Sequence, residues 1–345
     1  MRKAPPVIQL ALLGAGRIGQ THARAIAANP DARIAAIHDP DAEAARRAAP
    51  DARPATIAEL AADPAIDGVL ICTPTDTHAD LIEVFARAGK AIFCEKPVDL
   101  DVARVRACLR VVQDQGATLM IGFNRRFDPH FRAARAAIDQ GRIGSVEQVI
   151  ITSRDPGLPP LDYLPKSGGI FRDMTIHDFD MARFMLGEEI ASVMATASVL
   201  VDPAVGALGD YDTVSVILTT PSGRQAVISN SRRATYGYDQ RVEVHGSLGA
   251  VTASNEQPVM VELADAHGYR RGPLHDSFMT RYQAAYAAEI AAFVALIRDP
   301  SLPHPGGADG LAALILAEAA LESVRSGRRV DVGAGDAPGA GAGQG

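Results

Sequence analysis

Several features that mark common classes of protein are scarce or absent in this chain. It has only three cysteines, Cys72, Cys94 and Cys108, among 345 residues, and no two of them form a C-x-x-C pair. An odd number of cysteines without such a pair offers neither a disulfide framework nor a zinc cluster, and it fits a reduced cytoplasm. There is no long uncharged apolar run, so we expect no membrane span. The net charge of -7 argues against a nucleic-acid or an anionic-membrane partner.

The motifs of several enzyme classes are also missing. The chain has no G-x-S-x-G, no Walker motif and no obvious cluster of histidine, cysteine and aspartate, so we expect no metal. Arg2 and Lys3 precede "VIQLALLGAG" and superficially resemble the start of a signal peptide. Cleavage after this run would destroy the glycine motif that it leads into, so we expect a cytoplasmic protein.

What is present suggests two domains. In the first third, five apolar runs alternate with helix-like segments: "VIQLALLG", "ARIAAIHD", "DGVLICTP", "KAIFCEKP" and "TLMIGFN". This alternation predicts an α/β domain over residues 1–125 with a doubly wound parallel sheet covered on both faces. From about Gly144, partly alternating runs predict an α+β domain over 126–332 with a mostly antiparallel sheet. Its helices are expected at 171–186, 277–298 and 307–326. Residues 333–345, rich in glycine and alanine, are expected to be a disordered tail.

The most informative short motif is "GAGRIG", a G-x-G-x-x-G that follows an apolar run and opens a helix-like segment. Gly14 would allow the tight turn, Gly16 the approach of a pyrophosphate, and Gly19 close packing of helix and strand. Arg17 and Ile18 fall within the same turn and are expected to contact the cofactor. The alternative is a tight turn without a ligand.

Asp39 follows Gly19 by twenty residues and ends the second apolar run. A carboxylate there can accept hydrogen bonds from the adenosine ribose and would repel a 2′-phosphate, which favours NAD over NADP. The alternative is that Asp39 only starts the turn "DPDAE".

The ends of the next apolar runs carry further candidates for the cofactor site. Thr73 and Pro74 are expected beside the nicotinamide, and Glu95 and Lys96 end the fourth run. A lysine at that position can hydrogen-bond a substrate hydroxyl and steady its oxygen as charge shifts. His78 falls in the first turn of the following helix. A structural role is its favoured interpretation, with cofactor contact as the alternative.

The segment "GGIFRDMTIHDFDMARFML" supplies the acid–base candidates. On one helix, Asp173 and His177 would lie on a single face, four residues apart, with Asp180 continuing it. His177 is the best candidate for a general base, and a carboxylate one turn away could orient it. The alternative is a surface helix with an ordinary charged face.

Other polar residues are weaker candidates for contact with the substrate. Arg126 suits a hydroxyl-rich or anionic ligand, although "RRFD" could instead tie the two domains together. Asp155, Tyr236 and Tyr238 could line a polyol pocket or could have ordinary loop roles.

Together these residues resemble the glucose–fructose oxidoreductase/inositol dehydrogenase/rhizopine-catabolism (Gfo/Idh/MocA) family from about Val7 to Val332. "EKP" and D-x-x-x-H are marks of that family, and "GFNRRFD", "SRDP" and "SGGIFRDMTIHDFDMARFMLGE" resemble its inositol 2-dehydrogenases. The resemblance implies a Rossmann domain, a second domain with a large open sheet, a homotetramer and NAD as hydride acceptor. It implies the catalytic set Lys96, Asp173 and His177, substrate contacts from Asp155, Tyr236, Tyr238 and Arg126, and a cis Lys96–Pro97 bond.

The resulting hypothesis is an NAD-dependent dehydrogenase that oxidises a ring hydroxyl of myo- or scyllo-inositol to an inosose. His177 would take the hydroxyl proton, Lys96 would hold the oxygen, and Asp173 would orient His177 or a neighbouring hydroxyl. One alternative is an enzyme of the same fold that oxidises a hexopyranose such as glucose, including L-glucose, or reduces a keto-sugar. Another is a non-catalytic NAD(H) sensor, against which the co-occurrence of Lys96, Asp173 and His177 argues.

Overall fold

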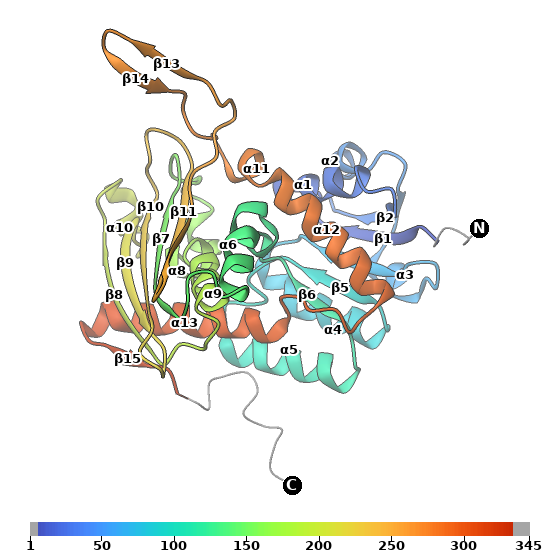
Figure 1. The fold of residues 1–345 in the computed structure, drawn as a ribbon. Helices are drawn as coiled ribbons and strands as arrows, with labels where there is room; N and C mark the ends of the chain where they lie inside the picture. Colours follow the sequence, from blue (N-terminus) through green and yellow to red (C-terminus); the bar gives the residue numbers. More distant parts are fainter. Residues whose placement is uncertain (1–5, 334–345) are drawn as a thin grey trace. The chain divides into compact units, whose positions relative to one another are not determined.

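The computed structural model describes residues 6–333, which fold into two compact units (Figure 1). The first contains the chain up to Asp128 together with Gln283–Leu311, and the second contains Pro129–Tyr282 and the chain from Ala312 onward. The segment 283–311, assigned to the second domain from the sequence, therefore packs within the first unit. The expected tail lies outside the described residues except for Gly333.

The first unit is built on a six-stranded sheet in the order β3-β2-β1-β4-β5-β6, and all of its strand pairs are parallel. The strands are β1 (Ile8–Leu13), β2 (Ala32–His38), β3 (Arg53–Pro54), β4 (Gly68–Ile71), β5 (Ala91–Cys94) and β6 (Leu119–Ile121). The strand order reverses between β1 and β4, which is where doubly wound sheets bind their ligands. The five predicted strands are confirmed, and only the two-residue β3 was not foreseen.

Helices connect these strands and cover the sheet. They are α1 (Arg17–Ala27), α2 (Ala42–Ala48), α3 (Ile57–Ala62), α4 (His78–Arg87), α5 (Val102–Asp114) and α12 (Gln283–Arg298), with 3-10 turns η1 (Thr75–Thr77) and η2 (Asn124–Phe127). Leu10 and Leu12 of β1, Leu70 of β4 and Phe93 of β5 are buried in one core with Phe293 of α12. Strands buried on both faces explain the nearly unbroken apolar runs in the sequence.

The second unit is built on a seven-stranded sheet in the order β12-β11-β7-β10-β9-β8-β15. Its strands are β7 (Val146–Arg154), β8 (Ser192–Ser198), β9 (Thr213–Thr219), β10 (Gln225–Ser231), β11 (Asp239–Gly246), β12 (Gly249–Ala253) and β15 (Val330–Asp331). Only β7 and β10 pair in parallel, and the other pairs are antiparallel. This confirms the predicted combination of a parallel sheet with a mostly antiparallel one.

One face of this second sheet is covered and the other is exposed. Along β9, Val214, Val216 and Leu218 are buried whereas Ser215 and Ile217 are exposed, as the period of two requires. The helices are α6 (Pro129–Asp139), α7 (Leu164–Ser167), α8 (Ile170–Asp173), α9 (Ile176–Leu186), α10 (Pro203–Ala207), α11 (Phe278–Arg281) and α13 (Gly307–Ser326), of which α13 belongs to this unit from Ala312 onward. Of these, α9 packs on β7 and β10, and α6 packs on β12.

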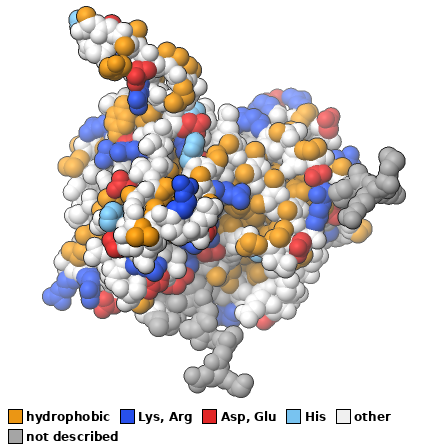
Figure 2. Space-filling model, viewed as in Figure 1, with side chains coloured by type: hydrophobic (Ala, Val, Ile, Leu, Met, Phe, Trp, Pro, Cys, Tyr) orange, Lys and Arg blue, Asp and Glu red, His pale blue; other side chains and the backbone are white. Residues whose placement is uncertain are grey.

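A hairpin of β13 (Glu262–Asp265) and β14 (Gly268–Arg271) extends away from the large sheet of the second unit (Figure 1). Apolar side chains lie along it (Figure 2), and Met260 and Tyr269 are 83% and 78% exposed. These two strands were not predicted, because their residues show no clear alternation of apolar and polar side chains.

The three cysteines all lie in the first unit, and all are buried and free. Burial, with the nearby charge of Glu95, raises the pKa of the Cys72 and Cys94 thiols well above the ordinary value. Burial also raises the pKa of Cys108 to about 12. Within residues 6–333, no helix is long and apolar enough to cross a membrane.

Candidate active site

The glycine motif forms the turn between β1 and α1. Gly14 has φ +89°, and a Cβ there would lie 2.5 Å from the Cys72 carbonyl oxygen. A Cβ on Gly19 would clash with the Gly14 carbonyl oxygen. Only glycine fits both positions, because one needs left-handed backbone and the other lets α1 pack against the preceding turn.

The start of α1 is open on the side that a ligand would approach. Nothing lies within 4 Å of a Cβ built on Gly16, which is the N-cap of α1, and no side chain caps the helix there. By contrast, Asp41 caps α2 and Thr56 caps α3 with their side chains. Uncapped N–H groups at a helix N-terminus suit a pyrophosphate, so this turn fits a dinucleotide.

Asp39, at the end of β2, holds the glycine turn. Its Oδ2 accepts a hydrogen bond from the backbone N–H of Ala15 at 2.5 Å, and its Oδ1 accepts one from Asp41 at 2.7 Å. Asp39 therefore starts the following turn and also fixes the backbone beside Gly16. Each carboxylate oxygen can accept a second hydrogen bond, so the contact with the ribose stays a prediction.

His78 bridges the ends of two neighbouring strands. Its Nε2 lies 2.8 Å from the carbonyl oxygen of Thr73, after β4, and its Nδ1 lies 2.8 Å from that of Pro97, after β5. The ring is buried, which supports the structural interpretation of this residue. Pro74 is the N-cap of η1, the turn that leads from β4 into α4. The Lys96–Pro97 bond is cis, as the resemblance implies.

Glu95 is buried beside a histidine that sequence analysis did not single out. Its Oε1 lies 2.6 Å from Nε2 of His22 on α1. Glu289 of α12 is fully buried nearby, and neither of its carboxyl oxygens has a hydrogen-bond partner among the described residues. Burial, reinforced by the charge of Glu95, raises the pKa of Glu289 well above its ordinary value. A lone histidine inside an alanine-rich helix gave no signal of this cluster.

In the second unit, Asp173 and His177 do not share one helix as the sequence predicted. Asp173 ends α8 and His177 lies in the first turn of the separate helix α9. The helix is interrupted because the N–H of Thr175 bonds back to the carbonyl of Ile170, five residues earlier. The buried Thr175 hydroxyl bonds to the Asn230 side chain on β10, which holds the break in place. This tertiary contact overrides the helical spacing.

Asp173 is held by two side chains, one nearby in the sequence and one distant. Its Oδ1 accepts a hydrogen bond from the Tyr163 hydroxyl at 3.0 Å, and its Oδ2 lies 3.3 Å from Nη2 of Arg232. The Arg232 side chain is only 2% exposed. Neither partner was predicted: Arg232 is 59 residues away, and Tyr163, ten residues before Asp173, falls in no recognised motif.

The buried side of α9 is also polar. Asp178 is fully buried and accepts hydrogen bonds from Ser153 at 2.6 Å and from Asn230 at 2.8 Å. Asp180 is buried as well, so it does not extend an exposed face from His177. These contacts fix α9 on the strands β7 and β10 and thereby place His177, which is only partly exposed.

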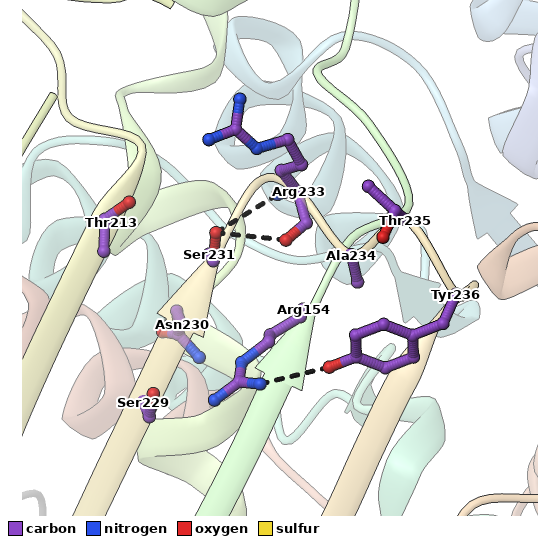
Figure 3. Close-up of a pocket in the computed structure, with 9 residues that line it drawn as sticks. All are labelled: Arg154, Thr213, Ser229, Asn230, Ser231, Arg233, Ala234, Thr235 and Tyr236. Atoms are coloured by element: carbon purple, nitrogen blue, oxygen red, sulfur yellow. Dashed lines mark hydrogen bonds between the residues drawn. The ribbon is translucent and has the colours of Figure 1, made fainter. Parts of the chain in front are cut away.

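Tyr236 lines a cavity of about 400 Å³ at the ends of β7, β9 and β10 (Figure 3). The cavity is lined by Arg154, Thr213, Ser229, Asn230, Ser231, Arg233, Ala234, Thr235 and Tyr236. Tyr238 is not among these residues: it is buried, and its ring packs edge-on against Tyr282 at 6.0 Å. The structure thus separates two tyrosines that the sequence placed together.

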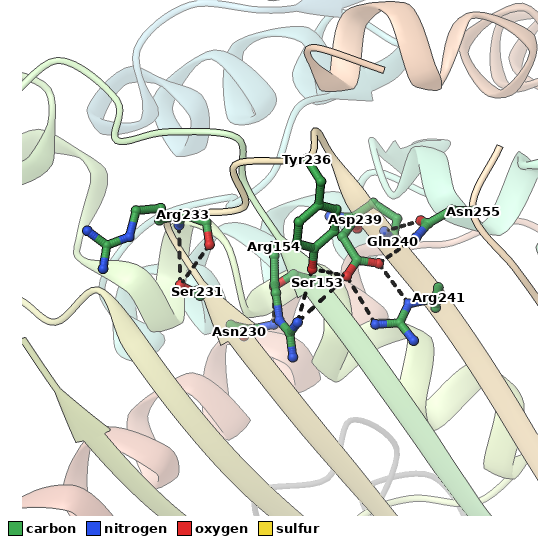
Figure 4. Close-up of polar contacts among 10 residues, drawn as sticks. All are labelled: Ser153, Arg154, Asn230, Ser231, Arg233, Tyr236, Asp239, Gln240, Arg241 and Asn255. Atoms are coloured by element: carbon green, nitrogen blue, oxygen red, sulfur yellow. Dashed lines mark hydrogen bonds and ion pairs between the residues drawn. The ribbon is translucent and has the colours of Figure 1, made fainter. Parts of the chain in front are cut away.

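Two of the residues that line this cavity, Arg154 and Tyr236, contact the carboxylate of Asp239 (Figure 4). The Tyr236 hydroxyl donates to Asp239 at 2.7 Å and accepts from Arg154 at 3.0 Å. Burial raises the pKa of Asp239, but hydrogen bonds from Arg241, Asn255 and Tyr236 outweigh burial and hold it below the ordinary value. Asp239 is therefore a charged anchor for the surrounding donors.

The remaining candidates lie at the ends of elements. Arg126 of η2 pairs with Asp309, at the start of α13, at 2.7 Å, and both belong to the first unit. Asp155 directly follows β7, and its N–H donates to the Ser231 carbonyl oxygen. Among residues 6–333, no group of three or more histidine, cysteine, aspartate or glutamate side chains could hold a metal ion.

Two family models match the chain. Residues 8–123 match the oxidoreductase family with an NAD-binding Rossmann fold, and residues 131–252 match the GFO/IDH/MocA C-terminal domain. The chain belongs to the Gfo/Idh/MocA family. It is thus an NAD-dependent oxidoreductase, and the glycine turn described above lies in its NAD-binding domain.

Members of the Gfo/Idh/MocA family with high similarity include enzymes that act on inositols. The chain is 64% identical over 327 residues to inositol 2-dehydrogenase of Rhizobium meliloti (strain 1021), covering 94% of this chain and 99% of the relative. A crystal structure of a myo-inositol dehydrogenase from Corynebacterium glutamicum has a TM-score of 0.91 and 45% identity, covering 95% and 99% of the two chains. A scyllo-inositol dehydrogenase from Lactobacillus casei, solved with NAD(H) and scyllo-inositol, has a TM-score of 0.87 and 28% identity, covering 94% and 99%.

Proposed function

We propose that this chain oxidises a ring hydroxyl of an inositol, myo- or scyllo-inositol, to an inosose. The observation that carries the proposal is the 64% identity with inositol 2-dehydrogenase over 94% of this chain and 99% of the relative. That span includes both units, so the similarity is not limited to the part that binds the cofactor. NAD, when bound, accepts the hydride from the ring carbon.

The proton chemistry is assigned to two residues. The Lys96 ammonium donates a hydrogen bond to the substrate oxygen and stabilises the negative charge that develops on it. His177 accepts the hydroxyl proton, because a neutral imidazole is a competent base near neutral pH. A buried carboxylate, Asp178, follows His177 directly and fixes the first turn of its helix.

Asp173 is assigned an orienting role. Arg232 and Tyr163 hold its carboxylate from two sides, so it keeps a defined direction. A carboxylate fixed in this way can orient His177 or accept a hydrogen bond from a neighbouring ring hydroxyl. Of the weaker candidates, Asp155, Tyr236, Tyr238 and Arg126 are retained as contacts with the polyol. Tyr238 is the least supported because its ring packs on Tyr282.

The same proposal covers the cofactor contacts. Gly14, Gly16, Arg17, Ile18 and Gly19 surround the pyrophosphate, and Asp39 binds the ribose. The turn is supported by the open approach to Gly16 and by the uncapped N-terminus of α1. Thr73, Pro74, Glu95 and Lys96 are assigned to the nicotinamide end, where their strands end. His78 is assigned there only through the backbone that it holds.

We further propose a cytoplasmic homotetramer without nucleic-acid or membrane partners. The exposed face of the second sheet carries Ile150, Met194 and Ile217, each at least 40% exposed. Apolar side chains at such exposure on one sheet face favour burial against another copy of the chain. The net charge of -7 supports the absence of anionic partners.

The decisive experiment is a substrate panel with purified protein, followed by NADH absorbance. Myo-, scyllo- and chiro-inositols are compared with D- and L-glucose, each with NAD and with NADP. We expect an inositol with NAD to give the highest kcat/KM. If a pyranose gives the highest kcat/KM, the chain is still an oxidoreductase, but the inositol assignment is wrong. If the protein binds NADH but turns over no polyol, the alternative of a non-catalytic NAD(H) sensor is favoured.

A further inference from the structure

Lys96 lies between two residues that are each held by a buried histidine. Glu95, on its N-terminal side, contacts His22 at 2.6 Å. Pro97, on its C-terminal side, contacts His78 at 2.8 Å through its carbonyl oxygen. The two histidines are 0% and 2% exposed, and they come from α1 and α4. The backbone that carries Lys96 is therefore fixed from two helices.

The His78 ring connects this backbone to the neighbouring strand end. Its two nitrogens face two carbonyl oxygens, those of Thr73 and Pro97, both at 2.8 Å. Carbonyl oxygens only accept, so a hydrogen bond forms where a ring N–H faces one of them. A ring packed at hydrogen-bond distance between both carbonyl groups fixes the spacing between the chain after β4 and the chain after β5.

The His22 ring is held just as closely. It packs edge-on against Phe93 at 4.9 Å and against Tyr286 at 5.3 Å. Room for its partner Glu95 is provided by Gly122, where a Cβ would lie only 3.1 Å from the carboxyl carbon of Glu95. Neither ring nor carboxylate can move without displacing a neighbour.

Glu289 lies in the same buried cluster, where its charged form is disfavoured. Both Glu289 oxygens lack a hydrogen-bond partner among the described residues, and burial raises the pKa of this carboxyl. A buried charge without a partner is strongly disfavoured, so Glu289 stays protonated. His22 contacts Glu95 in this water-poor environment, where a hydrogen bond is stronger than in water.

We infer that His22 and His78 are positioning residues for Lys96. They fix the segment from Glu95 to Pro97 from opposite sides and so hold the Lys96 ammonium in the direction that the proposed reaction requires. Because His22 lies on α1, the same contact joins the helix of the glycine turn to the segment that carries Lys96. The inference rests on the proposed role of Lys96. The contacts that fix the backbone around Lys96 are observed independently of that role.

The test compares two substitutions at each histidine. His22→Phe and His78→Phe keep an aromatic ring but remove both nitrogens, whereas His22→Gln and His78→Gln keep one side-chain donor. We expect the Phe variants to lower kcat by roughly 10- to 100-fold, as displacements of about 1 Å do, with a smaller change in KM for the inositol. The Gln variants should recover part of this loss. His304→Gln is the matched control, because within residues 6–333 His304 bonds only to the Leu302 carbonyl of its own loop.

A second readout does not depend on turnover. The chain has only four lysines, Lys3, Lys90, Lys96 and Lys166, so acetylation of each can be followed by mass spectrometry. Lys166, in the second unit, serves as the internal reference. Loosening the segment around Lys96 should raise its acetylation rate relative to Lys166 several-fold in the His22 and His78 variants. The His304 control should leave this ratio unchanged.

The outcomes separate this inference from the proposed function. If the parent protein oxidises no inositol, the proposed function fails, and the acetylation ratio alone decides the positioning role. If the Phe variants do not fold, the Gln variants test the positioning role instead. We expect their kcat to be a few-fold below that of the parent. Unchanged kcat and unchanged Lys96 acetylation in folded variants of both histidines would overturn the inference.

Discussion

The two units hold their functional side chains in different ways. In the first unit, polar residues follow the ends of parallel strands and bond mainly to backbone, as Asp39 does to Ala15 and His78 does to two carbonyl groups. In the second unit, side chains bond to side chains from other elements, as in the pair of Asp173 and Arg232. Backbone partners are present whatever the residue type, whereas a side-chain partner is lost with one substitution. The second unit should therefore be the more sensitive to mutation.

The largest effect is expected from His177→Ala, which tests whether the proton chemistry belongs to the second unit. Removing a positioned general base should lower kcat by roughly 10²–10⁴-fold. NAD affinity, a property of the first unit, should not change. Steady-state kinetics and a fluorescence titration with NADH measure the two quantities. His245→Ala is the control, since His245 is an exposed histidine of the same unit paired with Glu147. An equal loss of kcat in both variants would contradict the assignment.

The second prediction compares a buried and an exposed side-chain partner within the second unit. Arg232→Met leaves the Asp173 carboxylate without its buried cation and should lower the free energy of unfolding by about 3 kcal/mol. Arg241→Met removes a cation that is 45% exposed, and Asp239 keeps Asn255 and Tyr236 as donors. We expect about 1 kcal/mol or less there. Urea unfolding of both variants gives the comparison, and equal losses would refute the ranking.

A third prediction concerns the cofactor contacts of the first unit. Asp39→Ala removes both the expected ribose contact and the hydrogen bond to Ala15, and it should weaken NAD binding by about tenfold. Asp39→Asn keeps an acceptor for the Ala15 N–H, so it should bind NAD more tightly than the Ala variant. Calorimetric titration measures the affinities. Asp41→Asn is the control, because Asp41 caps α2 and should affect stability only. Unchanged affinity in Asp39→Ala would exclude the ribose role.

The smallest effect is expected at Glu289, a buried side chain of the first unit that has no hydrogen-bond partner among the described residues. Its pKa is raised by burial and by Glu95, so the folded state keeps a proton that the unfolded chain releases. The stability from this proton is therefore full below the ordinary pKa of 4.5 and falls as the pH rises from there to the folded-state pKa. Glu289→Gln removes this fall, so its stability relative to the parent should increase between about pH 4 and about pH 8. Thermal unfolding at both pH values decides, and a pH-independent difference would refute the raised pKa.

The comparison also explains how much could be predicted from the sequence. Parallel strands end on one edge of their sheet, so Asp39, Thr73 and Lys96 could be assigned to that edge from five apolar runs alone. In the second unit, the site depends on register between strands that are distant in sequence. Nothing in the sequence near Asp173 indicates Arg232, which follows β10.

Local sequence patterns gave a wrong prediction where a tertiary contact determines the structure. The spacing of Asp173 and His177 fits one helix, but the contact between Thr175 and Asn230 holds a break between α8 and α9. Similarly, α12 lies within the stretch predicted to be the second domain, yet Ile290 and Phe293 pack in the core of the first unit. Helical periodicity shows that these side chains are buried but not which sheet they pack against.

The distribution of the cysteines has a practical consequence. All three thiols lie within the first unit, and their raised pKa values make them poor nucleophiles while that unit is folded. Alkylation of the native protein should therefore be slow, and each modification should report an opening of the NAD-binding unit alone. The chain thus carries its own unit-specific probe of unfolding. With that probe, the stabilisation of this unit by a bound dinucleotide can be measured without any label or engineered residue.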